Sequence, residues 1–229
     1  MRVVVRFCWR YALCVAAVVL LSACQSPDVI APDVPAMSVL PMRDADLIPA
    51  STTMPSGTFA TPPRGFVAFC DRDPGQCKVL PNTAVPIALT AKTWQTLNRV
   101  DQSWNAAIKS EEDAAHYGQV DYWTIPADGY GDCEDYALAK RQALIADGFA
   151  ANNLLLALAR AQDGTAHIVL TVATDKGDYV LDNLSPSILP WTATGYQWIA
   201  RQSAGDGQWA FVGSGQAGDA RVATAEIKP

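Results

Sequence analysis

The stretch GYGDCEDYALAK, residues 129–140, places a cysteine directly after a glycine-rich turn. The residues that follow predict a helix from about Cys133 to Ala146, with Gly148 as its stop signal. Cys133 would then open the helix, where the partial positive charge of the N-terminus favours a thiolate and free backbone N–H groups can bind an oxyanion. Cys133 is therefore the candidate nucleophile.

Segments on either side of this stretch set the fold class. A helix is predicted from about Ala91 to Lys109, with Thr90 as its N-cap. Its apolar stripe, which is expected to face the core, consists of Trp94, Leu97, Trp104 and Ile108. Before it, residues 66–69 form an apolar run that predicts a short strand or an extended core segment. After the cysteine helix come β-like runs at 154–158, 167–172, 179–184, 196–200 and 209–212. Helices followed by antiparallel strands predict an α+β domain.

A base and an orienting acid for Cys133 can be found among the remaining polar residues. The chain has only two histidines. His116 lies among acidic neighbours in a polar segment, which is typical of a surface residue, whereas His167 opens a predicted strand. Asp182 follows on the next strand. Each residue taken alone is more often structural, but the order Cys133, His167, Asp182 predicts a catalytic triad.

The simplest hairpin register does not bring the histidine and the aspartate together. With Asp175 opposite Asp178, Asp182 pairs with Thr171, roughly 13 Å along the strand from His167. A triad therefore requires a bulge or a shifted register.

Acidic residues surround the candidate nucleophile. Asp132, Glu134 and Asp135 would repel a thiolate and raise the pKa of Cys133. Acids in the first turn of a helix also stabilise it through the dipole. Alternatively, Asp132 and Glu134, with Asp135 as a further ligand, bind a hard cation such as Ca²⁺, for which carboxylate oxygens are suitable ligands. Calcium would cancel the repulsion and fix the nucleophile loop.

The N-terminus has the pattern of an export signal. Residues 1–23 combine three arginines with an apolar run at 11–21 that is too short for a transmembrane helix. The run ends in LSAC, residues 21–24, which resembles a bacterial lipobox with Cys24 as the lipidated residue; a plain secretory signal is the alternative. Gln25 then indicates the outer membrane of a Gram-negative bacterium. We therefore expect a lipoprotein signal peptide at 1–23 and a periplasmic location.

Composition sets the remaining boundaries. Residues 24–63 carry eight prolines among small and polar residues, which predicts an extended tether behind the lipid. The folded domain is then expected over residues 64–229. The formal net charge is −6 and becomes −9 once the three arginines of the signal are removed. So acidic a chain disfavours nucleic acid or anionic lipid as a partner, and membrane contact is expected only through the lipid anchor.

Four of the six cysteines remain once the first two leave with the signal. Cys70 and Cys77 flank DPG, a turn sequence at 73–75, and are expected to form a disulfide in an oxidising compartment. With Cys24 lipidated, Cys133 is left over. An unpaired cysteine in such a compartment is a liability unless it is buried or used.

Several stretches together resemble the bacterial transglutaminase-like cysteine proteinases. GDCEDYA at 131–137, with Lys140 and Leu144 after it, resembles the nucleophile motif of that family. The stretches that resemble its other recurring segments are AHIVL at 166–170, YVLDN at 179–183, Phe69-Cys70 with Pro74 and Cys77, and DYWTIP at 121–126. The resemblance covers about residues 64–212.

The resemblance implies a papain-like or transglutaminase-like fold, in which Cys133 lies on a helix packed against an antiparallel sheet that carries His167 and Asp182. It implies a cysteine endopeptidase that works through a thioester acyl-enzyme. The best understood branch, the LapG-like periplasmic proteases, is calcium-dependent, and the matching acids here are Asp132 and Glu134. That branch cleaves a large surface adhesin in the cell envelope, which disperses biofilm, and an inner-membrane cyclic-di-GMP receptor inhibits it by binding.

Two other kinds of function stay open from the sequence. The same triad can transfer acyl groups between Gln and Lys side chains or deamidate Gln, because these reactions share the thioester. A non-catalytic envelope lipoprotein that uses the fold as a binding module belongs to a different class. The joint presence of Cys133, His167 and Asp182 argues against that module.

Overall fold

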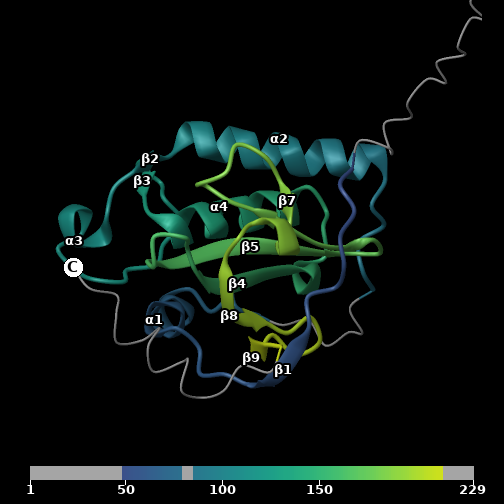
Figure 1. Ribbon diagram of the computed structural model, residues 1–229. Coiled ribbons are helices and arrows are strands. Elements are labelled where there is room, and N and C mark those ends of the chain that lie inside the picture. Colours follow the sequence, from purple (N-terminus) through teal and green to yellow (C-terminus); the bar gives the residue numbers. More distant parts are fainter. Residues whose placement is uncertain (1–47, 79–84, 214–229) are drawn as a thin grey trace, which may run out of the picture. The chain divides into compact units, whose positions relative to one another are not determined.

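An antiparallel sheet forms the centre of the part of the chain that the computed structural model describes, residues 48–78 and 85–213 (Figure 1). Its strand order is β1-β9-β8-β4-β5-β6-β7, and every neighbouring pair is antiparallel. The strands are β1 (Ser56–Phe59), β4 (Leu154–Arg160), β5 (Ala166–Thr174), β6 (Gly177–Leu181), β7 (Leu189–Pro190), β8 (Gln197–Gln202) and β9 (Trp209–Val212). The α+β prediction is confirmed.

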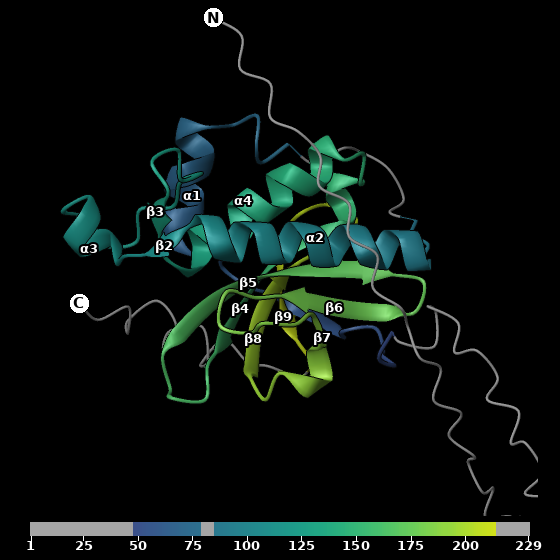
Figure 2. The same cartoon turned by 90° about the horizontal axis from the view of Figure 1, so that it is seen from above.

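Two long helices lie on the same side of this sheet (Figure 2). One of them, α4, packs on β5, and the other, α2, packs on α4. The helices are α1 (Arg64–Arg72), α2 (Ala91–Ala107), α3 (Asp113–His116) and α4 (Cys133–Ala146), with 3-10 turns η2 (Ala151–Asn153) and η3 (Trp191–Ala193). A small parallel pair joins β2 (Lys109–Ser110) to β3 (Tyr130–Gly131) just before α4.

The α4 helix is buried although its sequence is rich in polar residues. All of residues 134–140 are buried. Two of its polar side chains have partners inside the protein: Tyr136 donates its hydroxyl to the Ile108 carbonyl at 2.7 Å, and Lys140 pairs with Asp101 of α2 at 2.7 Å. Small alanines at 137 and 139 let the neighbouring elements approach. The α4 helix is therefore fixed by specific polar contacts as well as by apolar packing.

The two long helices begin as the sequence predicts. α4 runs from Cys133 to Ala146, and α2 begins at Ala91 after Thr90, whose hydroxyl accepts the Thr93 N–H at 3.1 Å. The short apolar run at 66–69 was assigned wrongly, because it lies in helix α1 and not in a strand. Periodicity cannot distinguish the two in so short a run.

The predicted tether at 24–63 is wrong in its last part. Met54 and Ala60 are buried, the Met54 N–H donates to Asp178 of β6 at 2.8 Å, and β1 pairs with β9. The folded domain therefore begins well before Arg64. Prolines favour extended backbone, but that preference does not decide whether the backbone packs against a sheet.

The other N-terminal predictions lie outside the described residues. These are the signal peptide at 1–23, the lipidation of Cys24 and the first part of the tether. Within residues 48–78 and 85–213, the helices are all too short or too polar to cross a membrane.

Candidate active site

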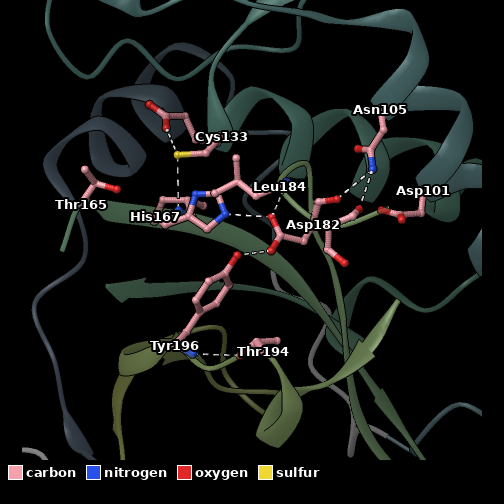
Figure 3. A network of polar contacts seen from close by, with 12 residues as sticks. Asp101, Asn105, Cys133, Thr165, His167, Asp182, Leu184, Thr194 and Tyr196 are labelled. Atoms are coloured by element: carbon pink, nitrogen blue, oxygen red, sulfur yellow. Dashed lines mark hydrogen bonds and ion pairs between the residues drawn. The ribbon is translucent and has the colours of Figure 1, made fainter. Parts of the chain in front are cut away.

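Cys133 is the first residue of α4 and lies against the beginning of β5 (Figure 3). Its Sγ accepts a hydrogen bond from the Ile168 backbone N–H at 3.4 Å and donates one to Glu134 Oε2 at 3.1 Å. The first backbone N–H groups of a helix have no partner within the helix. The thiol is therefore next to backbone donors that can bind an oxyanion.

His167 lies between Cys133 and Asp182 (Figure 3). His167 Nε2 bonds Asp182 Oδ1 at 2.8 Å, and both side chains are buried. Because Asp182 occupies Nε2, the Nδ1 atom is the ring nitrogen that remains for the thiol. The structure thus brings together the three residues that the sequence singled out.

Two further donors hold the Asp182 carboxylate. Tyr196 donates its hydroxyl to Oδ2, and the Leu184 backbone N–H donates to Oδ1 at 3.0 Å. Burial alone would raise the pKa of Asp182, but the hydrogen bonds and charge of His167 and the Tyr196 bond outweigh it, so the pKa lies below its usual value. A charged Asp182 fixes the orientation and tautomer of the imidazole.

The β5–β6 register explains how Asp182 reaches His167. The pair next to the turn is Thr174 opposite Gly177, not Asp175 opposite Asp178 as the simplest hairpin predicts. Continued to the end of β6, this register puts Asp182 opposite Val169, two residues from His167 on the same face. Such diagonal neighbours are within reach of long side chains. The shift that the sequence left open is therefore supplied by a turn of the same length that lies one residue earlier in the chain.

The acids around Cys133 disfavour its thiolate. Burial, and after it the charges of Glu134 and Asp132, raise the pKa of Cys133 well above its usual value. Burial and the Asp132 charge likewise raise the pKa of Glu134 well above its usual value. Burial and these two acids therefore favour the protonated thiol.

Carboxylates beside Cys133 form a cluster that could hold a metal ion. Ligand atoms of Asp113, Asp132 and Asp135 lie within 4.8 Å of one another, and those of Asp132, Cys133 and Glu134 do so as well. Buried oxygens of Asp113, Asp132 and Asp135 have no hydrogen-bond partner among the described residues. Several unpaired buried acceptors facing one another fit a hard cation.

The stretch DYWTIP, residues 121–126, braces this cluster. The Tyr122 N–H donates to Asp113 Oδ2, and the Thr124 N–H donates to Asp135 Oδ1 at 2.8 Å. Burial is the largest cause that raises the pKa of Asp113 to about 6 and of Asp135 to about 8. Gly131 leaves room for the cluster, because a Cβ there would lie 2.5 Å from Asp135 Oδ2.

Sequence reasoning missed two residues of this site. Asp113 lies 19 residues before Asp132 in a polar segment with no periodic signal, and Tyr196 looked only like the start of a strand. Both residues are brought to the site by the fold of the chain, and no local sequence pattern marks them. His116 belongs to a separate contact, because its Nε2 bonds Asp128 Oδ2 at 2.8 Å.

The predicted disulfide between Cys70 and Cys77 is present in the structure. Cys70, in α1, is joined to Cys77 by a disulfide with an S–S distance of 2.04 Å. Cys133 is the free cysteine of the described part of the chain.

A cleft of about 850 Å³ opens over the thiol and the imidazole. Leu158, Ile168 and Ile199 give it an apolar side, and Arg64 and Arg160 add positive charge. Leu184, whose side chain is mostly exposed, lies at the same cleft. The cleft is large enough for several residues of an extended chain. A thiol at a helix start beside a His–Asp pair, in such a cleft, is the arrangement of enzymes that work through a thioester.

Comparison with known proteins agrees with this class. The sequence profile of the bacterial transglutaminase-like cysteine proteinases (BTLCP) matches residues 56–217. The chain belongs to this family and is a cysteine proteinase. A search of curated proteins gave no match.

Solved structures similar to this chain include three of LapG from Legionella pneumophila, one of them calcium-bound and one EGTA-treated. Each is 23% identical, and the matches cover 72% of this chain and 88 to 90% of theirs, with TM-scores of 0.45 to 0.46.

Proposed function

We propose that the protein is an exported cysteine endopeptidase in which Cys133 is the nucleophile, His167 the general base and Asp182 the residue that orients it. The observation that carries the proposal is the 2.8 Å bond between His167 Nε2 and Asp182 Oδ1, with the opposite side of the imidazole ring toward Cys133 (Figure 3). A buried His–Asp pair beside a thiol at a helix start has few other uses.

In the proposed reaction, His167 Nδ1 takes the Cys133 proton, and Sγ forms a bond to the substrate carbonyl carbon. The oxyanion accepts hydrogen bonds, of which the Cys133 backbone N–H supplies one. As the C–N bond breaks, the imidazolium gives its proton to the leaving amine. Water then attacks the thioester with His167 as base, which frees the new carboxylate and restores the thiol. Asp182 stays ionised throughout and stabilises the imidazolium.

We also propose that the carboxylate cluster binds Ca²⁺, held by Asp113, Asp132, Glu134 and Asp135. The support is the unpaired buried oxygens and the raised pKa of Cys133. A bound Ca²⁺ supplies positive charge that offsets Asp132 and Glu134 and so favours the thiolate. In this proposal the same acids disfavour the thiolate in the metal-free protein and bind the ion that favours it.

The calcium proposal predicts how stability depends on pH. Without a cation, the pKa values of Asp113, about 6, and Asp135, about 8, lie above the usual 3.8. A carboxyl group whose pKa is raised by folding stabilises the folded protein at low pH, where it is protonated. This stabilisation is lost as the pH rises through the pKa of that group in the folded protein. The Tm measured in EGTA should therefore fall by about 5 °C between pH 5 and pH 8.5.

Excess calcium should remove most of this fall, because a bound cation favours the charged carboxylates. The lowered pKa of Asp182 acts only at more acidic pH and does not enter this window. Asp135→Asn should flatten the EGTA curve. Identical slopes in EGTA and in calcium would contradict the proposal.

The substrate we propose is a protein of the bacterial envelope, such as a large surface adhesin whose cleavage releases cells from a biofilm. Support comes from the sequence motifs, from the cleft, which suits an extended chain, and from the export pattern at residues 1–24. Cys24 would carry the lipid anchor. An inner-membrane cyclic-di-GMP receptor is the proposed inhibitor.

The experiment that tests the proposed chemistry is the rate of alkylation of Cys133 by iodoacetamide against pH, with calcium and with EGTA. An activated thiolate reacts well below pH 8.5, the ordinary thiol pKa being about 8.5. We expect rapid reaction with calcium and slow reaction with EGTA. Slow reaction with an ordinary profile in both would favour a non-catalytic binding module. Product masses from an envelope protein fraction then separate hydrolysis from Gln–Lys crosslinking and from deamidation.

A further inference from the structure

A second set of contacts holds the backbone of Asp182 rather than its carboxylate. Asn105 of α2 donates from Nδ2 to the Asp182 carbonyl at 2.8 Å and to the Ser185 carbonyl at 3.5 Å (Figure 3). These bonds tie the segment that follows β6 to α2. Asp182 lies just beyond the end of β6, so the strand ladder does not fix its carbonyl.

Asp101 lies one turn before Asn105 on the same side of α2. Its carboxylate pairs with Lys140 of α4 at 2.7 Å, and each side chain is only 1% exposed. Burial raises the pKa of Asp101, and the nearby charge of Asp182 adds to the rise, whereas the charge of Lys140 favours the ionised carboxylate. Asn105 therefore binds the backbone of Asp182, and Asp101, one turn earlier, ties α2 to α4 through Lys140.

Lys140 connects these contacts to the nucleophile. It lies two turns along α4 from Cys133, in the stretch GDCEDYALAK, and its charge is neutralised by Asp101. A buried ion pair is often no more stabilising than apolar side chains of the same volume. Asp101, Asn105 and Lys140 do not line the cleft, so contact with a substrate does not explain them.

We propose that Asp101, Asn105 and Lys140 are positioning residues of the active site. Together they hold the backbone of Asp182 at a fixed place relative to α4, so that its carboxylate stays on His167 while Cys133 reacts. This inference rests on the triad of the proposed function. It adds a series of contacts between α4, which carries Cys133, and Asp182. These contacts pass through α2 rather than through the imidazole of His167.

The first test compares Asn105→Ala with Asn98→Ala in the calcium-loaded protein. Asn98 makes an equivalent bond from the same helix, Nδ2 to the Trp94 carbonyl at 2.8 Å, but that carbonyl belongs to α2 itself. We expect Asn105→Ala to slow iodoacetamide alkylation of Cys133 at pH 7 about tenfold, and Asn98→Ala to leave it within twofold.

Proton NMR gives a direct readout of the bond between His167 and Asp182, and the comparison with Asn98→Ala controls for a loss of stability. With only two histidines in the chain, the His167 Nε2 proton can be assigned by comparison with His116→Asn. That proton should exchange faster with water in Asn105→Ala than in Asn98→Ala. Equal exchange in the two variants contradicts the proposal.

A double variant tests the buried ion pair. D101L/K140M replaces the pair by apolar side chains, which removes the tie between α2 and α4 without leaving a buried charge unpaired. It should alkylate Cys133 about tenfold more slowly than the wild type. A wild-type rate would mean that the pair contributes packing alone, and would overturn the roles of Asp101 and Lys140.

Asp182→Ala separates failure of this inference from failure of the triad. If Asp182→Ala alkylates at the wild-type rate, the triad and the positioning residues are both overturned. If it is slow while Asn105→Ala behaves like Asn98→Ala, only the positioning role is overturned.

Discussion

Cys133→Ala should lower peptide hydrolysis by a factor of about 10⁴ or more, because the proposed acyl-enzyme forms on Sγ and no other free thiol lies in the described part of the chain. The side chain is half-buried and alanine is smaller, so the fold should persist. The measurement is the appearance of new N-termini in an envelope protein fraction, followed by mass spectrometry.

Cys133→Ser is the matched variant, since it keeps the size and polarity of the side chain but not the acidity of the thiol. It should be nearly as inactive, with a circular dichroism spectrum and Tm close to those of the wild type. Hydrolysis retained in either variant at more than a hundredth of the wild-type rate would mean that another residue is the nucleophile.

Combined replacement of Asp132 by Asn and Glu134 by Gln should weaken calcium binding by at least about 100-fold, because two charged ligands are lost while their shapes are kept. Calorimetry measures this directly. The same variant should alkylate Cys133 faster than the wild type when both are in EGTA. The reason is that Glu134 and Asp132 are, after burial, the main causes of the raised pKa of Cys133.

Asp128→Asn is the control for the carboxylate variant. Asp128 is an exposed acid from the same stretch of chain, and it bonds His116 rather than the cluster. Its replacement should leave the calcium affinity and the alkylation rate unchanged. Unchanged calcium binding in the double variant would place the cation elsewhere and remove the support for control of the thiol by calcium.

The parts of the fold that could be predicted from the sequence are those set by local pattern. The α4 helix begins at Cys133 because a glycine-rich turn stops and helix-forming residues start there. The register of β5 and β6 could not be predicted, because a distant segment fixes it. Ile87 forms a bridge to Thr174 and accepts the Asp175 N–H at 3.0 Å, and these contacts hold the chain at the turn.

The residues of the site also fall into those that the sequence predicts and those that it does not. The order of Cys133, His167 and Asp182 along the chain was enough to select them. Asp113 and Tyr196 were missed because each is far along the chain from the residues that it contacts, and neither belongs to a recognisable motif. Residues of this kind become visible only when the neighbours of an already selected side chain are known.

The crowding around Gly131 has a consequence for how far related chains can diverge. A methyl group at this position would occupy the space of the Asp135 carboxylate, whose atoms lie 2.5 to 3.1 Å from the ideal Cβ position. A descendant that acquired alanine there would have to move that carboxylate or lose it. Such a lineage could retain a cysteine, a histidine and an aspartate in order, yet would be expected to have lost the metal control that we propose for Cys133.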